Sequence, residues 1–169
     1  MFKNLMILFM LFSVISLITT RYASNIPTAI DTTASTTNET IQNFSFTDIQ
    51  GKTGTLGQYK GKAVILHFWA TWCAPCVEEM PELIQKANAT PNVIFLLISV
   101  DHSIVAVQNF FGRMPIRTQG NIVLAYDPQS QIADLFKVSG LPATFILSSE
   151  GKLVQQFTGP AAWQNLQIR

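Results

Sequence analysis

The sequence feature that most constrains the fold is a six-residue segment, Val64–Trp69, that is apolar except for one histidine and leads, after three further residues, to the first of two cysteines. Such a run, with almost no polar alternation, is typical of a β-strand covered on both faces of a sheet. Pro75 lies between Cys73 and Cys76, where it suits the first turn of a helix. The segment therefore predicts a central strand that ends at the cysteine pair and a helix that begins there.

The two cysteines are the only ones in the 169 residues. Thiols three positions apart can close a small disulfide and open it again. A helix N-terminus presents unpaired backbone N–H groups and the positive end of the helix dipole, which together favour a thiolate near neutral pH. We therefore predict a redox pair in which Cys73 attacks and Cys76 resolves.

Other uses of a cysteine pair are less consistent with the sequence. Structural zinc needs four ligands, and the only further candidates of the right type are His67, inside one predicted strand, and His102, which follows a different one. A disulfide that closes so short a loop stabilises a fold little by chain entropy. Soft thiolates do select Cu(I), so a copper-carrying metallochaperone stays an alternative, although no other copper ligands stand out. We predict no resident metal and no cofactor.

Residues 1–21 form a leader in which Lys3 precedes a mostly apolar run, residues 5–18. This length lies where signal-peptide cores and short membrane spans overlap. No Ala-x-Ala pattern follows, because cleavage after Ala23 would place Arg21 where a small residue is needed. We therefore predict an uncleaved membrane anchor over a removed signal, and in either case an exported domain.

The rest of the chain divides into a tether and a domain. Residues 22–42 are polar, without helical or strand periodicity, which predicts a flexible linker. Residues 43–169 suffice for one domain with a sizeable core. The net charge of +1 and the 12% of charged residues leave no basic face for nucleic acid. We therefore expect no nucleic-acid partner.

Strand and helix signals alternate within the domain. Phe44 and Phe46 alternate with polar residues before a glycine-rich stretch, which predicts a hairpin-like start. After Cys73, apolar residues recur on one face of the predicted helix, and Pro81 should kink it. Further strands are predicted at 93–100, 121–125, 143–147 and 153–157, and further helices at 104–111 and 129–136. This order predicts an α/β domain with a central mixed sheet flanked by helices.

Two separate motifs resemble those of the thioredoxin superfamily. Residues 67–76, His-Phe-Trp-Ala-Thr-Trp-Cys-Ala-Pro-Cys, are similar to its active-site strand and turn, and residues 140–145, Gly-Leu-Pro-Ala-Thr-Phe, are similar to its cis-proline loop. With Glu-Met-Pro at 79–81, they resemble the branch of TlpA-like and ResA-like membrane-tethered thiol-disulfide oxidoreductases. The resemblance covers about residues 43–157 and implies a thioredoxin-like three-layer sandwich. The long stretch before the second motif matches the extra strand and helix of that branch.

The resemblance implies roles for four further residues. Pro142 would follow a cis peptide bond and face the cysteines, which leaves the Leu141 backbone free to pair with an extended substrate chain. Trp72 would flank the exposed sulfur. Glu79, one helical turn after the second cysteine, would help proton movement at the dithiol, although the residues alone are equally consistent with a solvated surface glutamate. Glu78 is predicted to be exposed.

His67 departs from the family pattern. Plain thioredoxins have a buried aspartate six residues before the first cysteine, and TlpA-like proteins often have an amide there. An imidazole at this place could transfer protons near neutral pH. It could also be a neutral core residue that needs only a hydrogen-bond partner. Both interpretations stay open at the level of the sequence.

The resemblance implies an enzyme that reduces disulfides of exported proteins, such as apocytochrome c in cytochrome c maturation. The Ala-Pro pair between the cysteines is closer to the Gly-Pro of reducing thioredoxins than to the Pro-His of strong oxidants, and a disulfide oxidase or isomerase is the alternative. We expect a monomer that receives electrons from a membrane thiol-reductant donor protein. Its expected location is the periplasmic face of a bacterial inner membrane, or the periplasm if the leader is cleaved.

Overall fold

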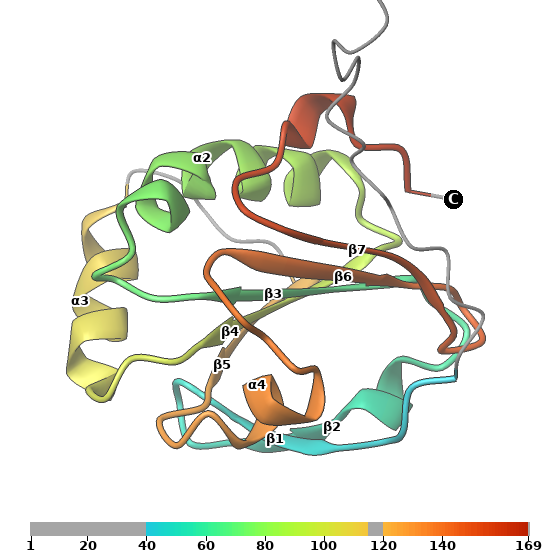
Figure 1. Cartoon of the computed structure of the whole chain (residues 1–169), viewed down its shortest axis with the longest axis horizontal. Helices are drawn as coiled ribbons and strands as arrows, with labels where there is room; N and C mark the ends of the chain where they lie inside the picture. The colour runs from blue at the N-terminus through green and yellow to red at the C-terminus, as the bar shows by residue number, and fades with distance from the viewer. Residues whose placement is uncertain (1–39, 115–119, 169) are drawn as a thin grey trace, which may run out of the picture. The chain divides into compact units, whose positions relative to one another are not determined.

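The computed structural model describes residues 40–114 and 120–168. The predicted leader, residues 1–21, and residues 22–39 of the predicted linker lie outside the described residues. None of the helices within the described ranges combines the length and the apolarity of a membrane span. The elements follow one another along the chain as β1 (Ser45–Asp48), β2 (Thr53–Thr55), η1 (Leu56–Tyr59), β3 (Val64–Trp69), α2 (Ala74–Ala89), β4 (Ile94–Ser99), α3 (Ile104–Arg113), β5 (Ile122–Tyr126), α4 (Gln131–Leu135), β6 (Ala143–Leu147), β7 (Leu153–Thr158) and η2 (Trp163–Asn165) (Figure 1).

The described strands form one seven-stranded mixed sheet in the order β2-β1-β5-β4-β3-β6-β7. β3, β4 and β5 are parallel to one another, and the remaining neighbours are antiparallel. α2 and α3 cover one face of the sheet, and α4 covers the other (Figure 1). These three layers confirm the predicted α/β sandwich. α3 and β5, which lie between β4 and α4 along the chain, are the extra helix and strand.

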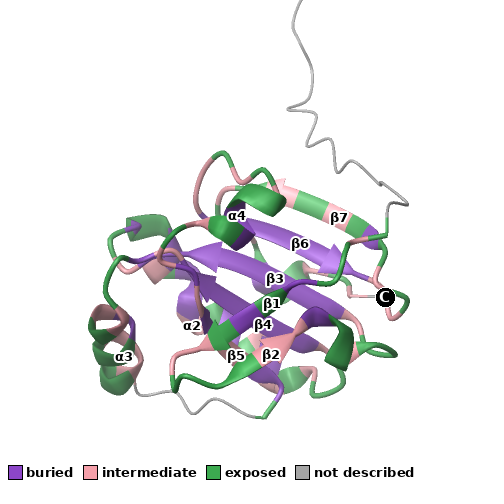
Figure 2. Ribbon diagram, turned by 90° about the horizontal axis from the view of Figure 1, so that it is seen from below, coloured by how far each residue is buried: buried purple, intermediate pink, exposed green. Residues whose placement is uncertain are grey.

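β3 is the strand that the apolar segment predicted. All of its residues are buried, because it lies between β4 and β6 and is covered on both faces (Figure 2). Leu66 and Phe68 pack into the core on the α4 side, whereas Ile65 and Trp69 pack into the core on the α2 side. Because side chains alternate along a strand, His67 also points to the α2 side. The strand therefore delivers one polar side chain beneath α2.

α4 is shorter than the predicted range, 129–136. Ser130 has a left-handed backbone, with a φ of 56°, so the helix does not continue back through it. The helix begins one residue later, where the carboxylate of Asp127 accepts hydrogen bonds from the first-turn N–H groups of Gln131, Ile132 and Ala133 at 2.9, 2.9 and 3.0 Å. A carboxylate at this end of a helix also interacts favourably with the helix dipole. The start of α4 is thus set by the side chain of Asp127, four residues before the helix begins.

The packed domain begins before residue 43. Thr40 forms an isolated antiparallel bridge with Lys152, and the Ile41 N–H donates to the Gly151 carbonyl at 3.0 Å. These contacts lie at the turn between β6 and β7. The last residues of the predicted linker are therefore in contact with the sheet.

Candidate active site

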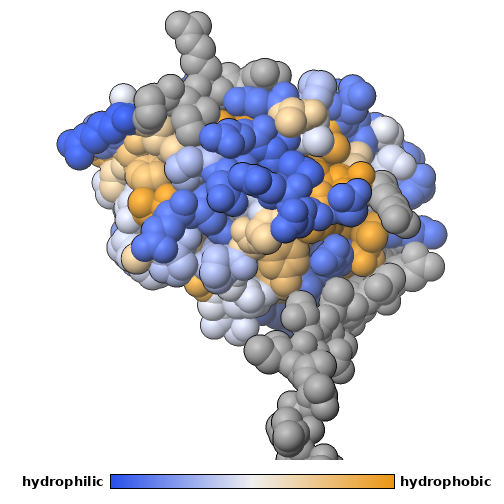
Figure 3. Space-filling model, turned by 90° about the horizontal axis from the view of Figure 1, so that it is seen from above, coloured by the Kyte–Doolittle hydropathy of each residue, from blue (hydrophilic) through white to orange (hydrophobic). Residues whose placement is uncertain are grey.

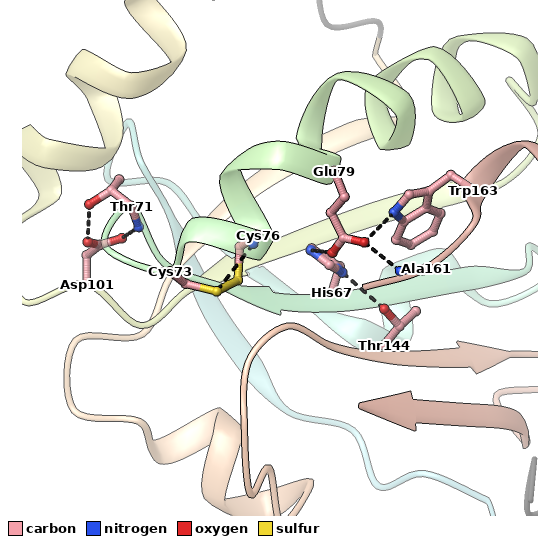
Figure 4. The surroundings of a disulfide bond; sticks show 9 residues. All are labelled: His67, Thr71, Cys73, Cys76, Glu79, Asp101, Thr144, Ala161 and Trp163. Carbon is pink, nitrogen blue, oxygen red and sulfur yellow. Dashed lines mark hydrogen bonds and ion pairs between the residues drawn. A yellow bond between two sulfur atoms is a disulfide. The ribbon is translucent and has the colours of Figure 1, made fainter. Parts of the chain in front are cut away.

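The two cysteines lie where β3 gives way to α2. Cys73 is the N-cap of α2, and its Sγ accepts a hydrogen bond from the Cys76 N–H at 3.3 Å. Pro75 lies in the first turn of the helix, as predicted. The two sulfurs form a disulfide bond (Figure 4). Both cysteines are buried, but Cys73 is 6% exposed whereas Cys76 is 0% exposed, so only Cys73 has any surface that a partner can reach.

Glu79 projects from α2 into the core. Its Oε2 accepts hydrogen bonds from the Ala161 N–H at 2.7 Å and from the Trp163 indole N–H at 3.0 Å. Glu79 is buried, whereas Glu78 is exposed, as predicted. Burial raises the pKa of the Glu79 carboxyl, and the two N–H donors oppose that shift. The sequence-level alternative of a solvated surface glutamate is therefore wrong.

His67 faces Glu79 from β3 (Figure 4). Its Nε2 lies 3.5 Å from Glu79 Oε1, and its Nδ1 lies 3.1 Å from the Thr144 hydroxyl on β6. The Trp163 ring packs edge-on against the imidazole, with centroids 5.4 Å apart. The ring is fully buried, and burial lowers the pKa of His67 to about 3. His67 is therefore a neutral, hydrogen-bonded core residue that also contacts a carboxyl group.

The geometry of His67 and Glu79 leaves room for one shared proton. Within the described part of the chain, neither His67 Nε2 nor Glu79 Oε1 has a hydrogen-bond partner by strict geometry, although the two atoms face each other. A protonated Glu79 can donate to Nε2 while Nδ1–H donates to Thr144. An ionised Glu79 can instead accept from Nε2–H while Nδ1 accepts from the Thr144 hydroxyl. Both states keep the imidazole neutral, so a change of tautomer accompanies the loss of the proton from Glu79.

The second predicted motif lies beside the end of β3. The Leu141–Pro142 peptide bond is cis. Ala143, which follows it, pairs with Phe68, so Pro142 is next to the turn that carries Cys73. Pro142 is buried, and Leu141 is half-buried against the core cluster that contains both cysteines. Among the described residues, no hydrogen bond involves the Leu141 backbone, which leaves its N–H and C=O for a partner chain.

Trp72 precedes Cys73 and is 66% exposed. Trp69, by contrast, is fully buried and packs against Phe110 and Phe111 with ring centroids 5.1 and 5.4 Å away. The exposure of Trp72 next to Cys73 agrees with its predicted place beside the sulfur. A large exposed aromatic surface beside a redox-active sulfur suits contact with a polypeptide.

Asp101 is a site residue that sequence reasoning missed. It is buried at the carboxyl end of β4, and its carboxylate accepts hydrogen bonds from the Thr71 N–H at 2.9 Å, the Thr71 hydroxyl and the Ser99 hydroxyl at 2.7 Å. These contacts tie the turn before Cys73 to the neighbouring strand (Figure 4). The available signal was weak: an aspartate directly after a buried parallel strand, at the edge where β3 also ends.

Comparisons with known proteins agree with this geometry. The family model described as Redoxin matches residues 36–167. Thiol-disulfide oxidoreductase ResA of Bacillus subtilis is 37% identical over 119 residues, which cover 69% of this chain and 64% of that protein. Thiol-disulfide oxidoreductase ResA of Bacillus thuringiensis subsp. konkukian is 34% identical over 128 residues, which cover 74% of this chain and 71% of that protein.

A solved structure supports the same assignment. The pneumococcal exposed lipoprotein thioredoxin, Etrx1, of Streptococcus pneumoniae superposes with a TM-score of 0.63 at 26% identity, covering 73% of this chain and 93% of that chain. The fold, the Cys-x-x-Cys pair at the start of α2 and the cis-proline loop are thus found together with clear sequence similarity. The chain belongs to the Redoxin family, as a ResA-like thiol-disulfide oxidoreductase of the thioredoxin superfamily.

Proposed function

We propose that this protein reduces disulfide bonds in exported proteins and that Cys73 and Cys76 carry the electrons. The observation that carries the proposal is the position of the two sulfurs at the start of α2, with Cys73 accessible and Cys76 fully buried behind it. A substrate disulfide can then be attacked only by Cys73. The Cys76 N–H and the N-terminus of α2 stabilise the attacking thiolate.

The cycle transfers two electrons to the substrate. The Cys73 thiolate attacks one sulfur of the substrate disulfide, and the other substrate sulfur leaves as a thiolate. Cys76 then attacks Cys73 Sγ in the mixed disulfide. This step releases the second substrate thiol and leaves the Cys73–Cys76 disulfide of the structure. A reduced donor must then restore both thiols.

Glu79 and His67 hold a proton during this cycle. Cys76 must lose its proton before it attacks, and the buried pair lies one helical turn beyond it. The raised pKa of Glu79 lets this carboxyl carry a proton closer to neutral pH than an exposed glutamate would. The proton that Cys76 loses passes to ionised Glu79, and His67 stays neutral, which avoids a buried imidazolium.

The proposed setting is the periplasmic face of a bacterial inner membrane. The support is the leader predicted at residues 1–21 and the resemblance of the active-site motifs to those of membrane-tethered TlpA-like and ResA-like proteins. The chain acts as a monomer on extended cysteine-containing segments, apocytochrome c among them. A membrane thiol-reductant protein supplies its electrons, because an oxidising compartment does not.

Trapping the mixed disulfide tests this function. In a Cys76→Ser variant of the full-length chain, the intermediate with Cys73 cannot be resolved, so exported cysteine proteins should accumulate on it and be identifiable by mass spectrometry. Equilibration of the unaltered protein with glutathione should give a potential nearer the about −270 mV of thioredoxin than the about −120 mV of DsbA. A potential near the second value would overturn the reductive direction.

His67→Asn tests the proton role of the imidazole. An amide can keep a hydrogen bond to Thr144 but cannot exchange a proton with Glu79. We expect the pH profile for alkylation of Cys73 in the reduced protein to shift, and the rate of the resolving step to fall about a hundredfold, the low end for loss of a proton-transfer group. An unchanged profile would make His67 a purely structural residue.

A further inference from the structure

A groove opens between α2 and α3 beside the cysteines. Its volume is about 570 Å³. Val77 and Pro81 of α2 line it on one side, and Ala106 and Phe110 of α3, with Met114 at its C-terminal end, line it on the other. Clefts of a few hundred Å³ with a mostly apolar lining are typical of binding sites.

The groove is continuous with the redox site. Thr71, which also lines it, lies two residues before Cys73, and Val77 directly follows Cys76. Asp101 fixes Thr71 to the end of β4 through its N–H and its hydroxyl. The position of Thr71 relative to the sulfurs is therefore set by these two hydrogen bonds.

Strand order places the groove opposite the cis-proline loop. β3, which leads to Cys73, lies between β4, which leads to α3, and β6, which follows Pro142. A polypeptide that pairs with Leu141 and crosses Cys73 therefore continues toward α3. Trp72, 66% exposed, lies next to the sulfur on this surface.

The surface around α2 is partly hydrophobic, as the binding of an apolar side chain requires. Figure 3 looks onto α2 and shows hydrophobic surface beside its hydrophilic outer face, including an area on the left, the side on which Figure 1 places α3. Pro81 has no N–H, so the Val77 carbonyl lacks its usual helical donor.

We propose that this groove is a specificity subsite for the polypeptide whose disulfide exchanges with Cys73, and that it takes an apolar side chain a few residues from the reacting cysteine. The inference rests on the proposed function, because disulfide exchange with a polypeptide is what brings an extended chain across Trp72. Selectivity then comes from the groove, whereas pairing with Leu141 is sequence-independent.

Peptides with one cysteine in mixed disulfide with thionitrobenzoate test the subsite. The Cys73 thiolate of the reduced, full-length chain in lipid nanodiscs attacks the peptide sulfur and releases coloured thionitrobenzoate; Cys76 then frees the peptide thiol. One leucine is placed in turn at each of the three positions on either side of the cysteine, against a serine background. We expect leucine on one side to raise the second-order rate constant about tenfold, as partial burial of its side chain would.

Two variants on the same helix locate the effect. Ala106→Phe fills the groove and should return the leucine peptide to the rate of the serine peptide. Val105→Phe adds a phenyl ring at the neighbouring, 56% exposed residue outside the lining, and should keep the preference. Thermal unfolding checks that each variant is folded. If Ala106→Phe does not fold, Ala106→Leu, which adds less bulk, replaces it.

The outcomes separate the subsite from the redox function. Equal rates for all peptides with the unaltered protein, or a preference that survives in the folded groove-filling variant, would overturn the subsite. Bis(2-hydroxyethyl) disulfide is too small to reach the groove, so all variants should exchange with it at the rate of the unaltered protein. Failure of the unaltered protein to exchange with this small disulfide would instead overturn the proposed function.

Discussion

Replacing Cys73 with serine is expected to slow disulfide exchange at least about a thousandfold, because loss of a catalytic nucleophile commonly costs that much or more. A serine hydroxyl stays protonated at neutral pH, whereas a thiol at the N-terminus of α2 is held in its reactive form. Cys76 cannot take over, since it is fully buried. Release of thionitrobenzoate from its disulfide by the reduced variant measures the loss.

Cys76→Ser is the matched control for this prediction. Its Cys73 should still make the first attack within about tenfold of the unaltered rate, and the reaction should then stop at a mixed disulfide. The two variants carry the same substitution three residues apart, so the contrast reports position and not chemistry. A Cys73→Ser protein that formed mixed disulfides through Cys76 at a comparable rate would contradict the assigned roles.

The elements around the cysteines could be predicted because each has a strong local signal. Apart from His67, β3 is apolar on both faces, and α2 begins where Pro75 permits a helix but would obstruct a strand. The start of α4 could not be predicted in the same way. It depends on the hydrogen bonds that the Asp127 carboxylate accepts and on the left-handed backbone of Ser130. Neither follows from the hydrophobic pattern of the sequence.

The site shows the same division between local and tertiary information. Cys73, Cys76 and the cis bond before Pro142 follow from two short motifs. The contact of His67 with Glu79 does not, because the two residues lie on different elements and meet at 3.5 Å only when α2 packs on β3. From the residues alone, Glu79 is as consistent with a solvated surface glutamate as with a proton partner of the dithiol, and Trp163, which hydrogen bonds to it, carries no motif.

The buried pair is expected to make stability depend on pH in two opposing ways. Burial lowers the pKa of His67 from 6.5 to about 3, so its contribution to stability is complete above pH 6.5 and is lost as the pH falls toward 3. Burial raises the pKa of Glu79 above 4.5, so its contribution is complete below pH 4.5 and is lost as the pH rises through the raised pKa. In the unaltered protein the two effects partly cancel.

Single variants should separate these effects by sign. Glu79→Gln leaves only His67 to titrate, and we expect its free energy of unfolding to fall by about 2 kcal/mol from pH 7 to pH 5 relative to the His67→Asn, Glu79→Gln double variant. His67→Asn leaves only Glu79 and should gain stability over the same interval. Urea unfolding at each pH measures both, with the m value checked for constancy.

The opposite signs make this prediction specific to the pair. Every other titrating group is common to the two single variants and to the double variant, so its contribution cancels in the comparison. Equal pH slopes in the two single variants would mean that neither group changes its protonation on unfolding. Such a result would contradict the shared proton between Glu79 and His67, and would leave the carboxyl as an anchor for Trp163 alone.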